Sequence, residues 1–161
     1  RDDLSVVLDV WENEPAISAS LLQTVDLGTA HIAGYSYDGK LRGTEMIYRA
    51  ACDYLAEPVL WRAADELECA TNIDLRQHGS GDVLALARAA VLACYDIRED
   101  NARLRATLSL PAAERALAFD RLRKDYPLRR EFSESTVLLS EPAGAPVQLL
   151  SALGFQLFSN H

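Results

Sequence analysis

The chain has 161 residues, of which 49% are apolar and 25% charged, and its formal net charge is -8. This length suits one domain or two small ones and is enough to bury a sizeable core. The composition excludes disordered, collagen-like and coiled-coil chains. No stretch approaches the ~18 uncharged apolar residues of a membrane span. The excess of acidic side chains argues against a nucleic-acid-binding module.

The three cysteines, Cys52, Cys69 and Cys94, lie far apart in the sequence. An odd number of cysteines without a CxxC pair indicates neither a zinc knuckle nor a disulfide framework. We therefore expect reduced thiols and a cytoplasmic location. Of the three histidines, His161 is the last residue, which argues against a metal site built from three histidine ligands.

The chain begins with a short charged step and runs straight into the apolar residues 6–10, with neither an initiator Met nor the apolar region of a signal peptide. A domain rarely starts in a buried strand. We therefore expect this chain to be a piece of a longer protein.

The first third of the chain predicts the edge of an α/β domain. Residues 6–10 are typical of a strand covered on both faces. Residues 18–25 favour a short helix with Ser18 as its N-cap, and Gly28 ends that segment. Residues 30–33 predict a second extended piece.

The clearest helix covers residues 37–56, since apolar side chains repeat there at helical spacing. These side chains are Ile47, Tyr48, Ala51, Cys52 and Leu55. Pro58 is expected to stop the helix, because the residue before a proline is pushed out of the α region. Residues 58–71 then form a connector.

The remainder predicts a small α+β module. Asp82 is a good N-cap for a helix that follows it, and Gly154 suits the position after the end of another. Strands are expected at 73–75, 137–139 and 155–158, and helices at 83–97, from 111 onward and at 146–153.

Candidate functional side chains gather in the first 35 residues: Asp9, Glu12, Glu14, His31 and Tyr35. An acid inside an apolar strand is costly to bury unless it is paired, and at the carboxyl end of a strand it faces the ligand crevice of an α/β sheet. A histidine between apolar neighbours is more often a satisfied, half-buried side chain, and a glutamate before proline is more often solvated. The chain has no GxGxxG, HExxH or GxSxG motif.

Two segments change this balance. Residues 8–15, LDVWENEP, and residues 29–35, TAHIAGY, resemble the two halves of a signature of the NAD-dependent D-2-hydroxyacid dehydrogenases. The halves read D-V-x-x-x-E-P and [ST]-x-H-[IL]-[AG]-[GA]. One branch of this family is also similar over most of the chain, at residues 31–44, 94–100, 119–126, 129–132 and 153–155.

The resemblance implies a role for each residue of the signature. His31 would be the base that takes the hydroxyl proton of a 2-hydroxy acid while hydride passes to NAD, and Glu14 would bind its other ring nitrogen. Asp9 would accept a hydrogen bond from the nicotinamide carboxamide, and Gly34 would let the backbone approach the cofactor. Tyr35 would contact the substrate.

The resemblance also implies the organisation of the protein. Residues 1–35 would end a Rossmann-type, α/β NAD-binding domain, and residues 36–57 would return to the substrate-binding domain. Residues 58–71 would be a linker, and residues 72–161 an α+β domain that forms a homodimer. The Gly-rich pyrophosphate turn and the arginine that binds the substrate carboxylate are expected upstream of residue 1.

The branch implies oxidation of 4-phospho-D-erythronate to 3-hydroxy-2-oxo-4-phosphooxybutanoate in vitamin B6 biosynthesis. Two alternatives stay open: another D-2-hydroxyacid dehydrogenase, such as one for 3-phospho-D-glycerate, and a non-catalytic dimerisation module. Lys40 and Arg42 are candidates for binding the substrate phosphate or for a solvated helix start. Arg129 and Arg130 are a second anion site or a surface pair. We expect no nucleic-acid or membrane partner.

Overall fold

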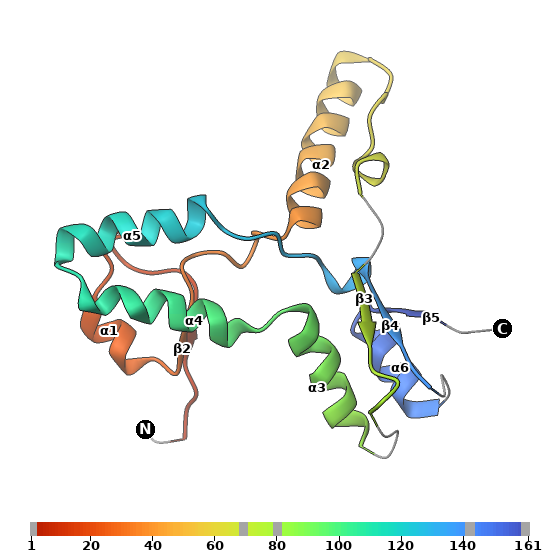
Figure 1. Cartoon of the computed structure of the whole chain (residues 1–161). Helices are drawn as coiled ribbons and strands as arrows, with labels where there is room; N and C mark the ends of the chain where they lie inside the picture. Colours follow the sequence, from red (N-terminus) through yellow and green to blue (C-terminus); the bar gives the residue numbers. More distant parts are fainter. Residues whose placement is uncertain (1–2, 68–70, 79–81, 141–143, 159–161) are drawn as a thin grey trace. The chain divides into compact units, whose positions relative to one another are not determined.

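The computed structural model describes residues 3–67, 71–78, 82–140 and 144–158. It is mixed α/β with small parallel sheets, and its contacts divide the chain into two compact units (Figure 1). The first unit combines Arg1–Tyr35 with Asp96–Pro127, and the second combines Ser36–Tyr95 with Leu128–His161. The chain therefore passes from one unit to the other three times. The predicted linear limits, 1–35, 36–57, 58–71 and 72–161, remain a prediction about the domains of the whole protein.

The first unit contains two short parallel strands and three helices. The strands are β1 (Val7–Leu8) and β2 (Leu27–Gly28), and Leu8 pairs with Gly28. The helices are α1 (Ala19–Thr24), α4 (Ile97–Ala106) and α5 (Ala112–Lys124), with a 3-10 turn, Thr107–Ser109, between the last two. Ser18 is the N-cap of α1, as predicted, because its hydroxyl accepts the Leu21 N–H.

One core joins these elements although their sequences lie far apart. Its buried side chains are Trp11, Ile17, Leu22, Val25, Ala30, Leu104 and Phe119. Asn101 and Arg105 fasten α4 to the β2 region, since the Asn101 carbonyl accepts the Gly28 N–H and Arg105 donates to the carbonyl of Val25. The segment that carries the predicted signature therefore packs against helices from the second half of the chain.

Three predictions for this part of the chain are wrong. Residues 30–33 are a turn rather than a strand, and Gly28 lies within β2 rather than at the end of a helix. A Cβ at Gly28 would lie 2.9 Å from both the Trp11 and Leu22 side chains, so the strand can pack there only with glycine. Val6, Val7 and Val10 are exposed rather than buried, because within the described ranges β1 pairs only with β2.

The predicted helix 83–97 ends earlier than expected, and a further helix that the sequence did not predict follows it. Helix α3 (Val83–Cys94) begins at the predicted N-cap, Asp82, but ends before an extended Tyr95. Asp96 then starts α4, since its carboxylate accepts the Arg98 N–H. An Asp followed three residues later by Glu99 is the sequence signature of such a start.

The second unit is built on a parallel sheet in the order β3-β4-β5. The strands are Thr71–Asp74, Ser135–Leu138 and Gln156–Phe158, each within two residues of its predicted position. Helices α3 and α6 (Gly144–Ala152) pack against each other beside it (Figure 1). Their shared core consists of Ile73, Leu75, Leu86, Ala87, Ala90, Val137, Leu150 and Phe155. Gly154 has the positive φ predicted for a residue after a helix end.

Helix α2 (Tyr37–Leu55) confirms the predicted helix, with Ser36 as its N-cap. It ends because Ala56 turns left-handed and donates to carbonyls of the last turn, before Pro58 is reached. Its apolar face, however, is largely exposed: Met46 and Ile47 are 71% and 74% accessible, respectively. A 3-10 turn, Ala63–Asp65, packs beside it.

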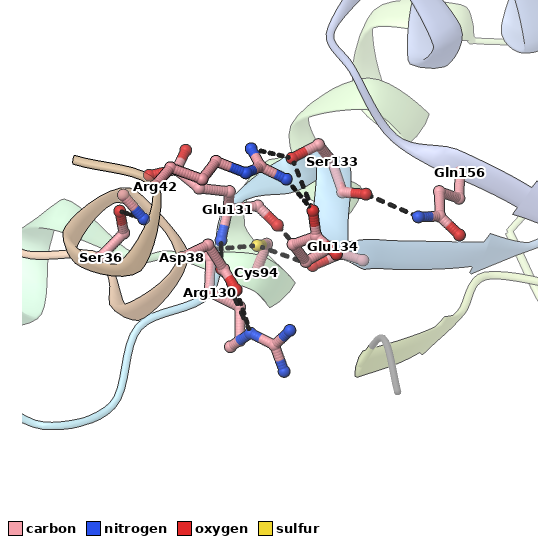
Figure 2. A network of polar contacts seen from close by, with 11 residues as sticks. Ser36, Asp38, Arg42, Cys94, Arg130, Glu131, Ser133, Glu134 and Gln156 are labelled. Atoms are coloured by element: carbon pink, nitrogen blue, oxygen red, sulfur yellow. Dashed lines mark hydrogen bonds and ion pairs between the residues drawn. The ribbon is translucent and has the colours of Figure 1, made fainter. Parts of the chain in front are cut away.

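The start of α2 is held by a buried ion pair (Figure 2). The fully buried Asp38 accepts from Nε of Arg130 at 2.9 Å and from the Glu131 N–H at 2.7 Å. Arg42 pairs with Glu134, next to a further 3-10 turn, Phe132–Glu134. Arg42 and Arg130 thus hold the second unit together.

Two further predictions concern a membrane span and residues outside the described ranges. No helix in the described ranges combines the length and the apolar run that a bilayer crossing requires. The turn at Gly79–Gly81 and the residues Cys69 and His161 lie outside the described residues.

Candidate functional site

The site begins where the two parallel strands of the first unit end. Because Leu8 pairs with Gly28, the next residues of both strands, Asp9 and Thr29, emerge side by side at the carboxyl edge. The Thr29 hydroxyl donates to Oδ1 of Asp9 at 2.6 Å. The expectation that Asp9 lies at the carboxyl end of a strand is therefore confirmed.

Asp9 also organises the turn that follows β2. Its Oδ1 accepts the Ile32 N–H at 2.8 Å and its Oδ2 accepts the Ala33 N–H at 3.0 Å. The turn closes further through the Tyr35 N–H, which donates to the Ile32 carbonyl. Within this turn His31 has a φ of 54°, a left-handed conformation that side chains adopt only where the surroundings enforce it.

The turn brings His31 onto Glu14. Nδ1 of His31 lies 2.8 Å from Oε2 of Glu14, while Oε1 of Glu14 accepts the Trp11 N–H at 2.8 Å. The Trp11 indole in turn donates to the Thr29 carbonyl at 2.8 Å. Both oxygens of Glu14 are thus engaged, and Trp11 joins the loop that carries Glu14 to the loop that carries His31.

Charges and hydrogen bonds keep both carboxylates ionised. Partial burial opposes ionisation of Glu14, but hydrogen bonds from His31 and the Trp11 N–H, with the positive charges of His31 and Arg123, hold its pKa below the usual value. Burial likewise works against Asp9, and donors from Thr29, Ile32 and Ala33 lower its pKa. Glu14, ionised and hydrogen-bonded to Nδ1 of His31, fixes the orientation of the imidazole ring.

Tyr35 is placed by α5 and the residues that follow it. The ring of Tyr126 meets the ring of Tyr35 edge-on, with centroids 5.9 Å apart. The guanidinium carbon of Arg123 lies 5.7 Å from the centroid of the Tyr35 ring. The Tyr126 hydroxyl donates to the buried Asp100 at 2.7 Å, so that ring is itself fixed from α4.

Space is open beside Gly34, where an added Cβ would meet nothing within 4 Å. A separate cavity of about 710 Å³ lies behind the turn, between Ala30, Ile32 and helices α4 and α5. Neither His31, Glu14 nor Tyr35 lines that cavity. The predicted site residues therefore lie at the edge of the strands, outside the cavity.

The structure brings together the predicted residues Asp9, Glu14 and His31, with Gly34 and Tyr35 on the same turn, whereas Glu12 is exposed. Sequence reasoning missed four neighbours: Trp11, Thr29, Arg123 and Tyr126. Trp11 and Thr29 lie inside the two signature segments, so their position in the sequence was a signal for them. Nothing local in the sequence links Arg123 or Tyr126 to a turn some ninety residues earlier.

A family model described as "Domain of unknown function (DUF3410)" matches residues 67–154, which is more than half of the chain. This chain belongs to the DUF3410 family. The matched range includes α4 and α5, so the DUF3410 domain supplies the helices that pack on the His31 turn.

Curated relatives are similar over nearly the whole chain. An erythronate-4-phosphate dehydrogenase of Marinobacter nauticus is 47% identical over 97% of this chain. Enzymes of the same name from Cellvibrio japonicus and Pseudomonas savastanoi are 46% and 42% identical, over 97% and 96% of this chain, respectively. The chain spans only 40–42% of the length of these relatives.

Proposed function

We propose that this chain is the C-terminal part of a dehydrogenase that oxidises 4-phospho-D-erythronate to 3-hydroxy-2-oxo-4-phosphooxybutanoate with NAD, a step of vitamin B6 biosynthesis in the cytoplasm. The observation that carries the proposal is the 2.8 Å pair between Nδ1 of His31 and Glu14 at the carboxyl edge of two parallel strands. The names of the relatives support the substrate.

His31 acts as the base. With Nδ1 donating to the Glu14 carboxylate, the tautomer that this bond selects leaves Nε2 as an acceptor for the proton of the substrate hydroxyl. The His31 side chain is 43% exposed, which gives a substrate access to the ring. Glu14 then stabilises the imidazolium, and in the reverse direction the same ring returns the proton.

The residues present fit NAD, which when bound would accept hydride from carbon 2 of the substrate. Asp9 would accept a hydrogen bond from the nicotinamide carboxamide, because its Oδ2 accepts one N–H within the described residues and has capacity for a second donor. Gly34 would face the cofactor, and the open space beside it supports a close approach. Tyr35 would direct its phenol to the substrate.

The remaining organisation follows the same proposal. Residues 1–35 would finish the NAD-binding domain and α2 would return to the substrate-binding domain. The exposed apolar side chains of α2, among them Met46 and Ile47, support such a covering partner. The DUF3410 domain would join two copies in a homodimer.

The test uses the full-length protein. The rate of NADH formation from 4-phospho-D-erythronate should exceed the rate from 3-phospho-D-glycerate. His31→Asn should lower this rate about 10²–10⁴-fold, as loss of a general base does. Light scattering should give a dimer for both proteins. A preference for 3-phospho-D-glycerate would favour the other hydroxyacid dehydrogenase, and an inactive dimer would favour the non-catalytic module.

A further inference from the structure

Arg123 lies in the first unit on the last turn of α5, beside the residues that the proposed function assigns to chemistry. Its guanidinium carbon is 5.7 Å from the centroid of the Tyr35 ring, within the range of a cation–π contact. Among the described residues, it is also the one cation outside the signature segments whose charge lowers the pKa of Glu14. Of the residues on which it acts, Glu14 pairs with His31, and Tyr35 follows His31 by four positions on the same turn.

The surroundings of Arg123 are unusual for a surface arginine of a helix end. Its Nε is buried and has no hydrogen-bond partner within the described residues. A buried N–H without an acceptor is costly, and such groups in folded proteins call for an explanation. The ordinary role of an arginine in the last turn, to complement the helix dipole, is already served by its exposed neighbours Arg121 and Lys124.

Tyr35 is held between two side chains that come from the DUF3410 domain. Tyr126 meets its ring edge-on at 5.9 Å and is itself fixed by the hydrogen bond to Asp100. Arg103, from the next turn of α4, donates to Asp100 at 2.8 Å and so fixes the direction of that carboxylate. A tyrosine with a second ring perpendicular to its own and a cation near its ring has few orientations left.

We propose that Arg123 is a positioning residue of the active site, which orients the Tyr35 phenol and supplies positive charge beside Glu14. The proposal rests on the function assigned to Glu14, His31 and Tyr35 above and extends it to α5. The DUF3410 domain is then part of the catalytic unit as well as a dimerisation domain. Its α5 sets the geometry and the charge of a site whose reacting residues lie some ninety positions upstream.

The charged groups around the pair fix the sign of the effect. Asp9 and Glu14 are the acids facing His31, and Arg123 is the cation from α5. Because the charge of Arg123 lowers the pKa of Glu14, loss of this cation raises that pKa. Because oxidation needs neutral His31 beside ionised Glu14, the acid side of the pH profile should move to higher pH.

The experiment compares Arg123→Met, Arg123→Lys and Arg121→Met in the full-length protein, with 4-phospho-D-erythronate and NAD as substrates. Arg123→Met should lower kcat/KM about tenfold and move the acid side of the pH profile upward. Arg123→Lys keeps the charge and should restore the pH profile while recovering only part of kcat/KM. Arg121→Met, an exposed arginine of the same helix, should change neither.

A second measurement separates this inference from the proposed function. Titration of the Glu14 carboxyl followed by NMR should show a higher pKa in Arg123→Met than in the wild type, because the charge of Arg123 lowers the pKa of Glu14, whether or not 4-phospho-D-erythronate is the substrate. Unfolding curves identify any variant that is merely unstable. An unchanged Glu14 titration in a folded Arg123→Met protein, or equal losses in the Arg121 and Arg123 variants, would overturn the proposal.

Discussion

Nδ1 of His31 and Oε2 of Glu14 lie 2.8 Å apart, although 17 positions separate the residues in the sequence. Two loops at the carboxyl ends of β1 and β2 meet to make this pair, and Trp11 holds them together. The carboxylate therefore reaches the imidazole with its second oxygen already bound, which fixes its direction.

The charge of Glu14 is expected to matter more than its hydrogen bond. Glu14→Gln keeps an acceptor for the His31 N–H but removes the charge that stabilises imidazolium, so kcat in the full-length protein should fall by about 10- to 1,000-fold. KM should change little, because in the proposed arrangement Glu14 binds His31 rather than the substrate. Steady-state kinetics with His31→Asn as the reference would show whether the loss is smaller than that of the base itself; an unaltered kcat would contradict this role.

The Glu14 carboxylate should also stabilise the fold in a pH-dependent way. Its pKa is lowered on folding from the ordinary 4.5, so the stabilisation is complete above that value and lost as pH falls through the folded pKa. The difference in unfolding midpoint between wild type and Glu14→Gln should be constant near neutral pH and shrink below pH 4.5. A difference that grows towards acid pH would have the wrong sign.

Asp9 should be required for the shape of the His31 turn. Asn in its place accepts at one oxygen only and cannot serve the hydroxyl of Thr29 and the backbone N–H groups of Ile32 and Ala33 together. Asp9→Asn should destabilise the protein by about 1–3 kcal/mol and lower kcat. Denaturant unfolding measures the first effect, and Thr29→Val, which removes one of the three donors, should give a smaller one.

The buried pair of Asp38 and Arg130 should be essential to the second unit. Asp38→Leu removes an ion-pair partner of the largely buried Arg130 and should cost about 3–5 kcal/mol. The double variant Asp38→Leu with Arg130→Met should cost less than either of its two single changes. Equilibrium unfolding of the four proteins forms a double-mutant cycle, and strictly additive losses would show that the pair is not coupled.

Cys94 should be a slow nucleophile. Burial raises the pKa of its thiol, and the nearby acids Glu131 and Asp38 add to this effect, which outweighs the hydrogen bond with Ser135. Iodoacetamide at neutral pH should therefore modify Cys94 only slowly in the folded protein and rapidly after denaturation. Mass spectrometry of peptides gives the rates, and fast labelling in the folded protein would contradict the environment described.

Local signals in the sequence were sufficient for most elements of the second unit. Asp82 and Gly154 mark ends of helices by their own chemistry, and Ile73, Val137 and Leu157 lie in the short apolar segments that predicted the three strands. Failures came where a distant contact overrides the local pattern. Residues 30–33 are as apolar as a strand, but Asp9 accepts their N–H groups and curls them into a turn.

The sequence by itself determined the signature residues, since Asp9, Glu14 and His31 stand at fixed spacings in two short segments, and it determined the excess of acidic charge. Only the tertiary structure decided that α5 lies against these segments. The physical reason is the core of the first unit, where Leu104 and Phe119 pack with Trp11 and Leu22. Burial is not directional and leaves no local pattern in the sequence, so the place of Arg123 beside Tyr35 appears only in the folded chain.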